Sequence, residues 1–375
     1  MSVERCVRYA KTYRTAGAPH DLTRARHLYE LSCEAGQSRA CLDLGVMYDA
    51  GEGGPKDEAR ARAFYAQACL SDHAEGCHRL AVMYDAGRGG PKHTSRAREH
   101  FDKACALGSA PGCFGLGVMC KAGRGGPYDK VAARQALDTA CAGKGAGVRG
   151  ESTPAACFEV AEMYEDGEGG EVDKSRARRL YEQACEGGYM RGCSNLGEMV
   201  SGGLGGPEDK AEARSLYKKA CDGNDMRGCR NLGVLFTTGK GGPEDKAEAR
   251  RLYKKACDGG FMKACNYLGV MVANGQGGPT DKAEARQLHK KACDGAVMGG
   301  CTNLGQAFTH GRGGPKDLVK ARRLFKKACD GDHMPGCAYL GVRIEYGEGG
   351  PKDRTEAKRL YKLACDGGFN KACDW

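Results

Sequence analysis

The chain of 375 residues carries 58 lysines and arginines against 48 aspartates and glutamates, for a formal net charge of +10. These charges alternate along the whole sequence and form no arginine-rich block, which argues against a nucleic-acid-binding surface. No apolar run approaches the roughly 20 residues that a membrane-spanning helix needs, so we expect no such span.

Cysteines are the most informative residues, because 20 of the 22 recur in pairs. Nine pairs read C-x7-C, the tenth carries an insertion of eight residues, and successive pairs begin 36 residues apart except across that insertion. A fixed period of this size predicts a solenoid of small repeated units. Cys6 and Cys120 stand outside the scheme. The predicted bridges are Cys33–Cys41, Cys69–Cys77, Cys105–Cys113, Cys141–Cys157, Cys185–Cys193, Cys221–Cys229, Cys257–Cys265, Cys293–Cys301, Cys329–Cys337 and Cys365–Cys373.

So many paired cysteines favour a disulfide framework over a metal site. Zinc sites prefer close ligand pairs such as C-x2-C, yet the sequence has no C-x-x-C and no histidine in phase with the cysteines. We therefore predict no metal and no cofactor. Disulfides imply an oxidising compartment, which is the periplasm, the cell exterior or, in a eukaryote, the mitochondrial intermembrane space. The first residues, MSVERCVRYAKTYRTAG, show no apolar core of a secretory signal.

Residues 193–221 illustrate one unit. Small and apolar residues at intervals of three and four from Cys193 to Val200 predict a short first helix. The run GGLGGP then turns the chain. Asp209, followed three residues later by Glu212, predicts the N-cap of a second helix that runs to Cys221. Each unit is therefore a helix, a glycine-rich loop and a second helix, and each bridge joins a second helix to the next first helix.

Repetition of this unit predicts a single solenoid over residues 1–375. The insertion between Cys141 and Cys157 is rich in glycine and polar residues, so we expect a surface excursion there and no domain boundary. The expected units are 3–36, 37–72, 73–108, 109–152, 153–188, 189–224, 225–260, 261–296, 297–332 and 333–368, followed by a tail at 369–375.

The repeated frame C-x-x-L-G-x-x-[YF]-x-x-G-x-G-G-P-x-D, followed by A-x-x-L-[YF]-x-x-A-C, resembles the Sel-one-like repeat family, relatives of the tetratricopeptide repeat. The resemblance implies an all-α, right-handed α/α superhelix of about ten 36-residue repeats. Cysteines at positions where most of the family has alanine resemble the cysteine-rich subgroup, the Helicobacter cysteine-rich proteins. One unit carries the frame as Leu232, Gly233, Phe236, Gly239, Gly242, Pro243, Ala249, Leu252, Tyr253 and Ala256.

The resemblance implies more than one function. Sel-one-like proteins generally act as adaptors, so the leading expectation is a scaffold with a protein or peptide partner. The cysteine-rich bacterial subgroup implies penicillin binding and slow β-lactam hydrolysis, with a β-lactam or a peptidoglycan-like ligand. A mitochondrial subgroup implies an assembly factor of the intermembrane space. Ser215 and Lys218 match S-x-x-K of serine β-lactamases, but S-D-N and K-T-G elements are absent, so we assign no catalytic residue.

A surface on the first helices is the candidate binding site. Residues two and nine positions after the second cysteine lie opposite the predicted core face, which is the concave side in related superhelices. Asparagine can bind an extended backbone through one donor and one acceptor, and tyrosine gives contact area with little loss of entropy. An ordinary solvated helix face remains an alternative. The expected groove residues are Asn195, Asn231, Tyr267, Asn274, Asn303, His310, Tyr339 and Tyr346.

Overall fold

The computed structural model describes residues 3–16, 19–143 and 152–375, and within these ranges it consists of helices and connecting turns without a strand. Two compact units emerge. Unit 1 comprises residues 1–192 and 204–206, and unit 2 comprises residues 193–203 and 207–375. The single solenoid expected over the whole chain stays a prediction. None of the described helices combines the length and the apolar character needed to cross a membrane.

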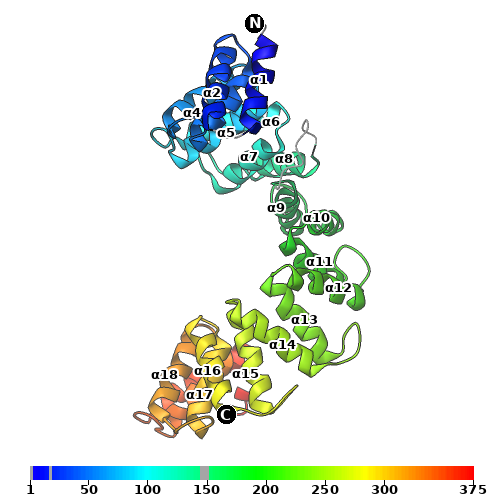
Figure 1. Ribbon diagram of the computed structural model, residues 1–375. Coiled ribbons are helices and arrows are strands. Elements are labelled where there is room, and N and C mark those ends of the chain that lie inside the picture. The colour runs from blue at the N-terminus through cyan, green and yellow to red at the C-terminus, as the bar shows by residue number, and fades with distance from the viewer. Residues whose placement is uncertain (1–2, 17–18, 144–151) are drawn as a thin grey trace. The chain divides into compact units, whose positions relative to one another are not determined.

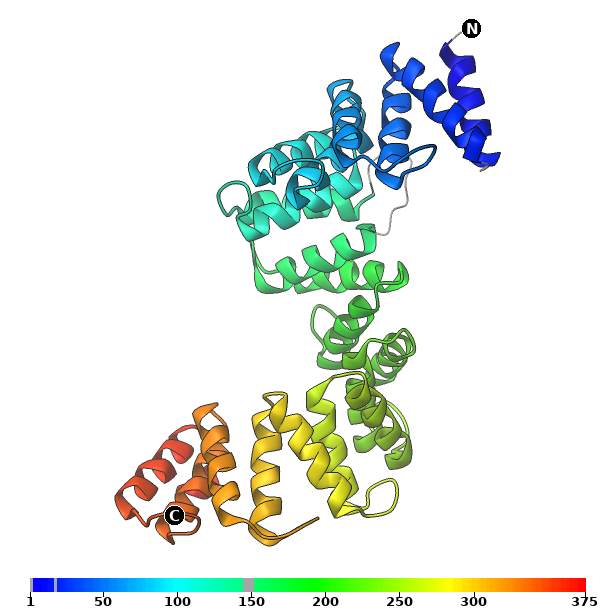
Figure 2. The same cartoon turned by 60° about the vertical axis from the view of Figure 1, so that its left-hand side comes forward.

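The helices follow one another as antiparallel pairs within each unit (Figure 1 and Figure 2). The first ten are α1 (Val3–Ala16), α2 (Pro19–Glu34), α3 (Ser38–Ala50), α4 (Glu58–Leu70), α5 (Ala74–Ala86), α6 (Thr94–Ala106), α7 (Ala110–Ala122), α8 (Lys130–Cys141), α9 (Ser152–Asp166) and α10 (Lys174–Glu186). The remainder are α11 (Met190–Gly202), α12 (Lys210–Asp222), α13 (Met226–Thr238), α14 (Lys246–Asp258), α15 (Met262–Asn274), α16 (Lys282–Asp294), α17 (Met298–His310), α18 (Leu318–Asp330), α19 (Met334–Glu345), α20 (Arg354–Asp366) and the 3-10 turn η1 (Asn370–Ala372).

Local sequence explains where the helices start and how they are connected. The carboxylate of Asp209 accepts hydrogen bonds from the backbone N–H groups of Ala211 and Glu212, as the capping pattern predicts. In the loops, Gly241 adopts a φ of +74°, and a Cβ there would lie 2.1 Å from the carbonyl oxygen of Lys210. Glycine is therefore required both by the left-handed backbone and by the close approach of the preceding repeat.

The core of each repeat joins a small residue on the first helix to a large one on the second. A Cβ on Gly233 would lie only 2.8 Å from the ring of Tyr253, so the absence of a side chain allows α13 and α14 to approach. The methionines six residues after the second cysteine are buried, as Met47 and Met271 show, so they are core residues. Met262 lies at the seam between repeats, against Gly295.

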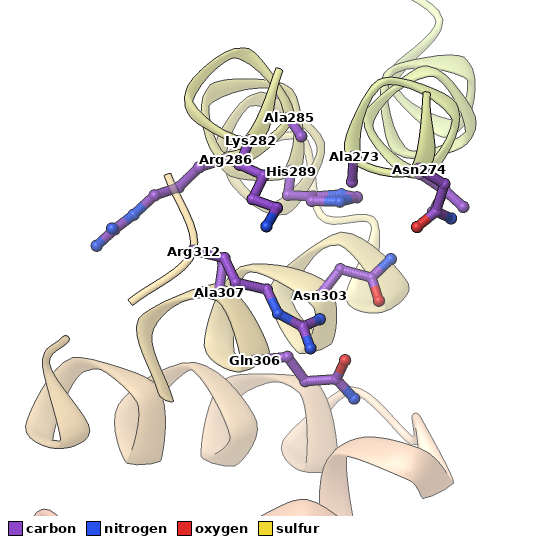
Figure 3. A pocket seen from close by; sticks show the side chains of 11 residues that line it. Ala273, Asn274, Lys282, Ala285, Arg286, His289, Asn303, Gln306, Ala307 and Arg312 are labelled. Carbon is purple, nitrogen blue, oxygen red and sulfur yellow. The ribbon is translucent and has the colours of Figure 1, made fainter. Parts of the chain in front are cut away.

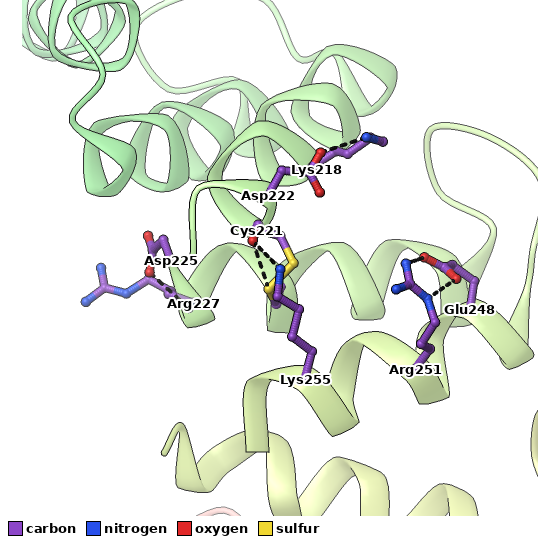
Figure 4. Close-up of a disulfide and its surroundings, with 9 residues drawn as sticks. Lys218, Cys221, Asp222, Asp225, Arg227, Glu248, Arg251 and Lys255 are labelled. Atoms are coloured by element: carbon purple, nitrogen blue, oxygen red, sulfur yellow. Dashed lines mark hydrogen bonds and ion pairs between the residues drawn. A yellow bond between two sulfur atoms is a disulfide. The ribbon is translucent and has the colours of Figure 1, made fainter. Parts of the chain in front are cut away.

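The cysteines form the expected framework. Nine of the predicted bridges are present with Cα–Cα distances of 4.4–5.0 Å, and Cys185 and Cys193 are also disulfide-bonded. Cys6 and Cys120 are free. In the repeat of Figure 4, the ammonium of Lys255 donates to the carbonyl oxygen of Cys221 at 2.7 Å, beside the disulfide. The bridges indicate an oxidising environment.

An arginine on several of the second helices provides another link between repeats, which the sequence pattern of one unit did not reveal. The guanidinium of Arg214 lies 3.7 Å from the ring centroid of Phe236, and it donates to the carbonyl oxygen of Pro243 at 3.2 Å. Arg62 repeats the arrangement with Tyr84 and Pro91. We call this contact of arginine, aromatic ring and proline carbonyl the arginine clamp.

Most of the insertion between Cys141 and Cys157 lies outside the described residues. Helix α8 ends at Cys141 and α9 begins at Ser152, but residues 144–151 lie outside the described part of the chain. The surface excursion expected there stays a prediction.

Candidate binding site on the first helices

The candidate site lies in unit 2, where the first helices of neighbouring repeats lie side by side. Helix α15 contacts α17, and α17 contacts α19. Two neighbouring cavities open along these helices. We call the exposed side of α15, α17 and α19, together with these two cavities, the first-helix face.

The larger cavity has a volume of about 370 Å³ and lies between α15, α16 and α17. Figure 3 shows Lys282, His289 and Arg312 bordering one space, with Asn303 and Gln306 near the guanidinium of Arg312, whereas Arg286 points away. The guanidinium of Arg286 is occupied in an arginine clamp with Phe308 and Pro315. The lining residues are Val270, Ala273, Asn274, Lys282, Ala285, Arg286, His289, Asn303, Gln306, Ala307 and Arg312.

The cavity coincides with an exception in the repeat. Four residues before the first cysteine of each pair, unit 2 places large side chains such as Tyr217, Tyr253, Phe325 and Tyr361, but here the residue is His289. Its imidazole packs on Gly269 as those rings pack on their own glycines. Imidazole is smaller than phenol or phenyl, so the substitution leaves room between the helices.

Hydrogen bonds hold the wall of the larger cavity in place. The side-chain oxygen of Asn266 accepts from the amide of Asn303 at 2.9 Å and lies 3.0 Å from Nδ1 of His289. Because this oxygen can only accept, Nδ1 of His289 carries the proton and Nε2 is free to accept. Burial lowers the pKa of His289 to about 4, so the imidazole is neutral at neutral pH.

The smaller cavity, of about 220 Å³, continues along α17 and α19 and shares Gln306 and Arg312 with the larger one. Arg343 lines it and pairs with Glu348. Burial and then the cations of Arg312 and Arg343 lower the pKa of His310, which favours its neutral form. The complete lining is Gln306, Thr309, His310, Arg312, Phe325, Tyr339 and Arg343.

Four of the groove residues expected from sequence line these cavities: Asn274 and Asn303 the larger, His310 and Tyr339 the smaller. Two other groove residues are tyrosines that lie exposed, with 43% of Tyr267 and 68% of Tyr346 accessible to solvent. The ring of Tyr267 stacks on Tyr253, at a centroid distance of 5.4 Å.

The two asparagines nearest the start of unit 2 are used within the fold. Asn231 is only 6% exposed and donates to the carboxylate of Glu198 at 2.8 Å, so its expected place in an open groove is wrong. The helical period of one repeat put Asn231 outside, but the neighbouring first helix covers it. Asn195 is half-buried and accepts from the guanidinium of Arg227 at 3.1 Å.

Three other features of the described residues bear on chemistry. Sequence reasoning missed Lys282, Gln306 and Arg312, although a comparison of equivalent positions between repeats would have found the two cations. The S-x-x-K match offers no activated serine, because the ammonium of Lys218 pairs with Asp222 at 2.7 Å. Within the described ranges, no three His, Cys, Asp or Glu side chains are grouped so as to hold a metal ion.

Helix pairs of constant period, stapled in sequence and presenting an open face on their first helices, define a tetratricopeptide-like solenoid. A family model described as Sel1 repeat matches most of the sequence, and the chain belongs to the Sel1 repeat family. The ten matched segments are residues 6–37, 38–73, 74–109, 110–135, 154–189, 191–225, 227–261, 263–296, 300–333 and 335–369. No curated protein sequence matches the chain closely enough to count as a relative.

Two solved structures show the same fold. A protective antigen present in uropathogenic Escherichia coli strains, which displays an SLR fold, is 21% identical with a TM-score of 0.65, covering 99% of this chain and 88% of that chain. A Sel1 repeat protein from Oxalobacter formigenes is 22% identical with a TM-score of 0.58, covering 67% of this chain and 96% of its own. Helicobacter pylori cysteine rich protein B is 31% identical over 33% of this chain and 95% of its own, with a TM-score of 0.29.

Proposed function

We propose that this chain is a scaffold that binds a protein or peptide partner on the first-helix face of unit 2. The observation that carries the proposal is the pair of adjoining cavities along α15, α17 and α19, which four of the groove residues expected from sequence help to line. Their walls mix amide, imidazole, phenol and guanidinium groups with apolar surface, a composition suited to a peptide backbone and its side chains. Membership of the Sel1 repeat family supports a scaffold role in general terms.

Selection from a displayed peptide library on the purified, oxidised chain tests the proposal. We expect enriched peptides whose affinity falls at least tenfold in Gln306→Ala and in His310→Ala, since both side chains line the smaller cavity. The control is Lys254→Ala on α14, whose exposed ammonium pairs with Asp258 away from both cavities. Selected peptides that bind all three variants as tightly as the original chain would contradict the proposal.

The bridges also support a proposal about location. Disulfides persist in the periplasm and outside the cell and are rare in a reducing cytosol, so we infer that the chain works in the periplasm or after secretion. The intermembrane space is the equivalent compartment for a eukaryotic chain. Fractionation of the native cells tests this inference, and recovery of the oxidised chain in a cytosolic fraction would contradict it.

The resemblance also implied a β-lactam hydrolase, but no feature of the described residues favours one. Ser215 is exposed on α12, and Lys218 is engaged by Asp222, so a serine with a neighbouring base is lacking at that motif. We therefore propose the scaffold function alone.

A further inference from the structure

Ion pairs link neighbouring repeats at a recurring place in unit 1. One partner is the loop residue between the first two glycines, which stands eleven positions after the second cysteine of its repeat. It forms an ion pair with a charged side chain of the preceding repeat, and that side chain stands eight or seventeen positions after the second cysteine of the preceding repeat. Arg88 pairs in this way with Asp49 and with Glu58, and Arg124 pairs with Asp85.

Two further junctions of unit 1 keep the arrangement with the signs reversed. Glu52 pairs with Arg14 at 2.7 Å, and Glu168 pairs with Lys130 at 2.7 Å. The place is thus an ion-pair site in which one repeat supplies the charge and the preceding repeat supplies its opposite. We call it the junction pair.

At the larger cavity of unit 2 the junction pair is missing. The loop residue is Arg312, but the two positions that should supply carboxylates hold Ala273 and Lys282. No carboxylate lies within ion-pair distance of Arg312 in the described part of the chain. Figure 3 shows Lys282 and Arg312 reaching into the same space from different elements, and both line the cavity. Two cations therefore face a cavity whose lining contains no acid.

Lys282 also lacks the partner that two equivalent lysines of unit 2 have. Lys210 pairs with Glu208 at 3.1 Å and Lys246 pairs with Glu244 at 2.9 Å, in each case two residues earlier in the chain. The residue two positions before Lys282 is Thr280, which cannot form an ion pair. Among the described residues, Lys282 forms no ion pair.

The junction at Lys240 shows why the larger cavity differs from its neighbours. There too the loop residue is a cation and the two partner positions, Ser201 and Lys210, lack a carboxylate. Lys210, however, is held by Glu208, and a tyrosine, Tyr217, fills the position that His289 occupies at the larger cavity. Of these two junctions, the one at the larger cavity alone combines two cations that lack ion-pair partners among the described residues with a smaller side chain between the helices.

We propose that the larger cavity binds a carboxylate group of the partner, which takes the place of the acid missing from the junction pair. Arg312 offers a planar pair of N–H donors that matches both carboxylate oxygens, and Lys282 adds a second positive charge. The amides of Asn303 and Gln306 stand beside them to bind adjoining polar groups. This inference rests on the proposed function and names the chemistry by which the first-helix face recognises its partner.

A carboxylate can come from an acidic side chain or from a chain end, and three hexapeptide probes separate these sources. The probes are Gly-Ser-Gly-Glu-Gly-Ser amide, Gly-Ser-Gly-Gln-Gly-Ser with a free carboxyl end, and the latter peptide as an amide. The readout is the Nε–Hε NMR signal of Arg312 in the full chain. We expect a saturable shift with at least one of the two acidic probes and none with the neutral amide. An equal shift with the neutral amide would overturn the inference.

Two variants rebuild the missing junction pair: Ala273→Asp keeps both cations of the cavity, whereas Lys282→Glu also removes one of them. Ala273→Asp supplies the acid that Asp49 supplies to Arg88, and Lys282→Glu supplies the one that Glu58 supplies. We expect each change to weaken binding of the acidic probe at least tenfold, because Arg312 then has an internal partner. Ser201→Asp, which places an aspartate at the equivalent position of another repeat, leaves binding unaltered. Undiminished binding to both rebuilt variants would overturn the inference.

The result is separable from that of the proposed function. Library peptides that depend on Gln306 and His310 but bind Ala273→Asp undiminished would support the scaffold and overturn the carboxylate site. A saturable shift with an acidic probe that is lost in Ala273→Asp, without any enriched library peptide, would support the carboxylate site alone.

Discussion

His289 shows how one residue changes a repeat. Its equivalents are large and mostly aromatic, and its imidazole fills their place on Gly269 while leaving a cavity beside it. The side chain is 6% exposed, and burial lowers its pKa to about 4. Because the folded chain keeps this imidazole neutral, the folded state loses stability once the pH is low enough to protonate the same imidazole in the unfolded chain.

This residue predicts a pH dependence of stability. The unfolded chain protonates His289 near its ordinary pKa of about 6.5, whereas the folded chain resists until about 4. The stability that His289 contributes is therefore complete above that range and is lost as the pH falls from 6.5 toward 4, by about 2 kcal/mol at pH 5. His289→Tyr, which restores the residue of neighbouring repeats, should lose less stability between pH 7 and pH 5.

Urea unfolding of both proteins at the two pH values measures this difference. Other groups titrate equally in the original chain and in His289→Tyr, so they cancel in the comparison. An identical loss of stability in the two proteins would show that the imidazole does not titrate as its burial requires.

For the groove residues, the sequence predicted the type of side chain better than it predicted what surrounds that side chain in the fold. Asn303 and Asn231 occupy the same position in their repeats, yet Asn303 lines a cavity and Asn231 is buried beneath Glu198. The difference comes from side chains of the adjacent repeat, which the helical period of a single unit does not contain. Lys282 and Arg312 escaped notice for the same reason, because each is unusual only when compared with its equivalents at other junctions.

At the scale of the helices, the sequence of one repeat was sufficient to predict features whose residues all lie within that repeat. The capping aspartates, the glycine loops and the small residues facing aromatic rings all act within one repeat, and the structure contains them as expected. The arginine clamp was not foreseen, because it joins Arg214 on α12 to Phe236 and Pro243 in the next repeat. Its partners stand more than twenty residues away in sequence and become neighbours only after the repeats stack.

The clamp predicts unequal effects of two similar substitutions. Arg214→Met removes both the contact with the Phe236 ring and the hydrogen bond to Pro243, and we expect a loss of about 1–2 kcal/mol. Arg251→Met removes an exposed helical ion pair with Glu248, and we expect a change below about 0.5 kcal/mol. Urea unfolding of the two variants measures both values, and equal losses would contradict the clamp.

At the scale of the whole molecule, short helices of about 13 residues are marginal by themselves, so the links between repeats matter most. Each cystine that closes a loop of nine residues stabilises the fold by about 2.5 kcal/mol on the chain-entropy model. The spacing in the sequence was enough to predict this framework. Because the units repeat, the two cysteines of a pair recur at the same places in every unit, so each cysteine is expected to bond to the other member of its own pair. The junction pairs and clamps then add polar links beside the bridges.

The framework predicts how the thiols react. Without a reductant, alkylation should modify only the two free cysteines. Cys120 is 1% exposed and burial raises the pKa of its thiol, so it should react only after unfolding, whereas the half-buried Cys6 should react in the native chain. Mass spectrometry of the alkylated chain, before and after denaturation, counts the modified thiols. More than two, or Cys120 reacting as fast as Cys6, would contradict the pairing.

The central claim is that the bridges and clamps build the solenoid while the first-helix face of unit 2 binds the partner. Hydrogen exchange of the chain with and without a library-selected peptide tests this division most directly. We predict that the bound peptide slows exchange in α15, α17 and α19 and leaves α14 and α20 unchanged. Slowed exchange in α14 and α20, with α15, α17 and α19 unaffected, would contradict the account.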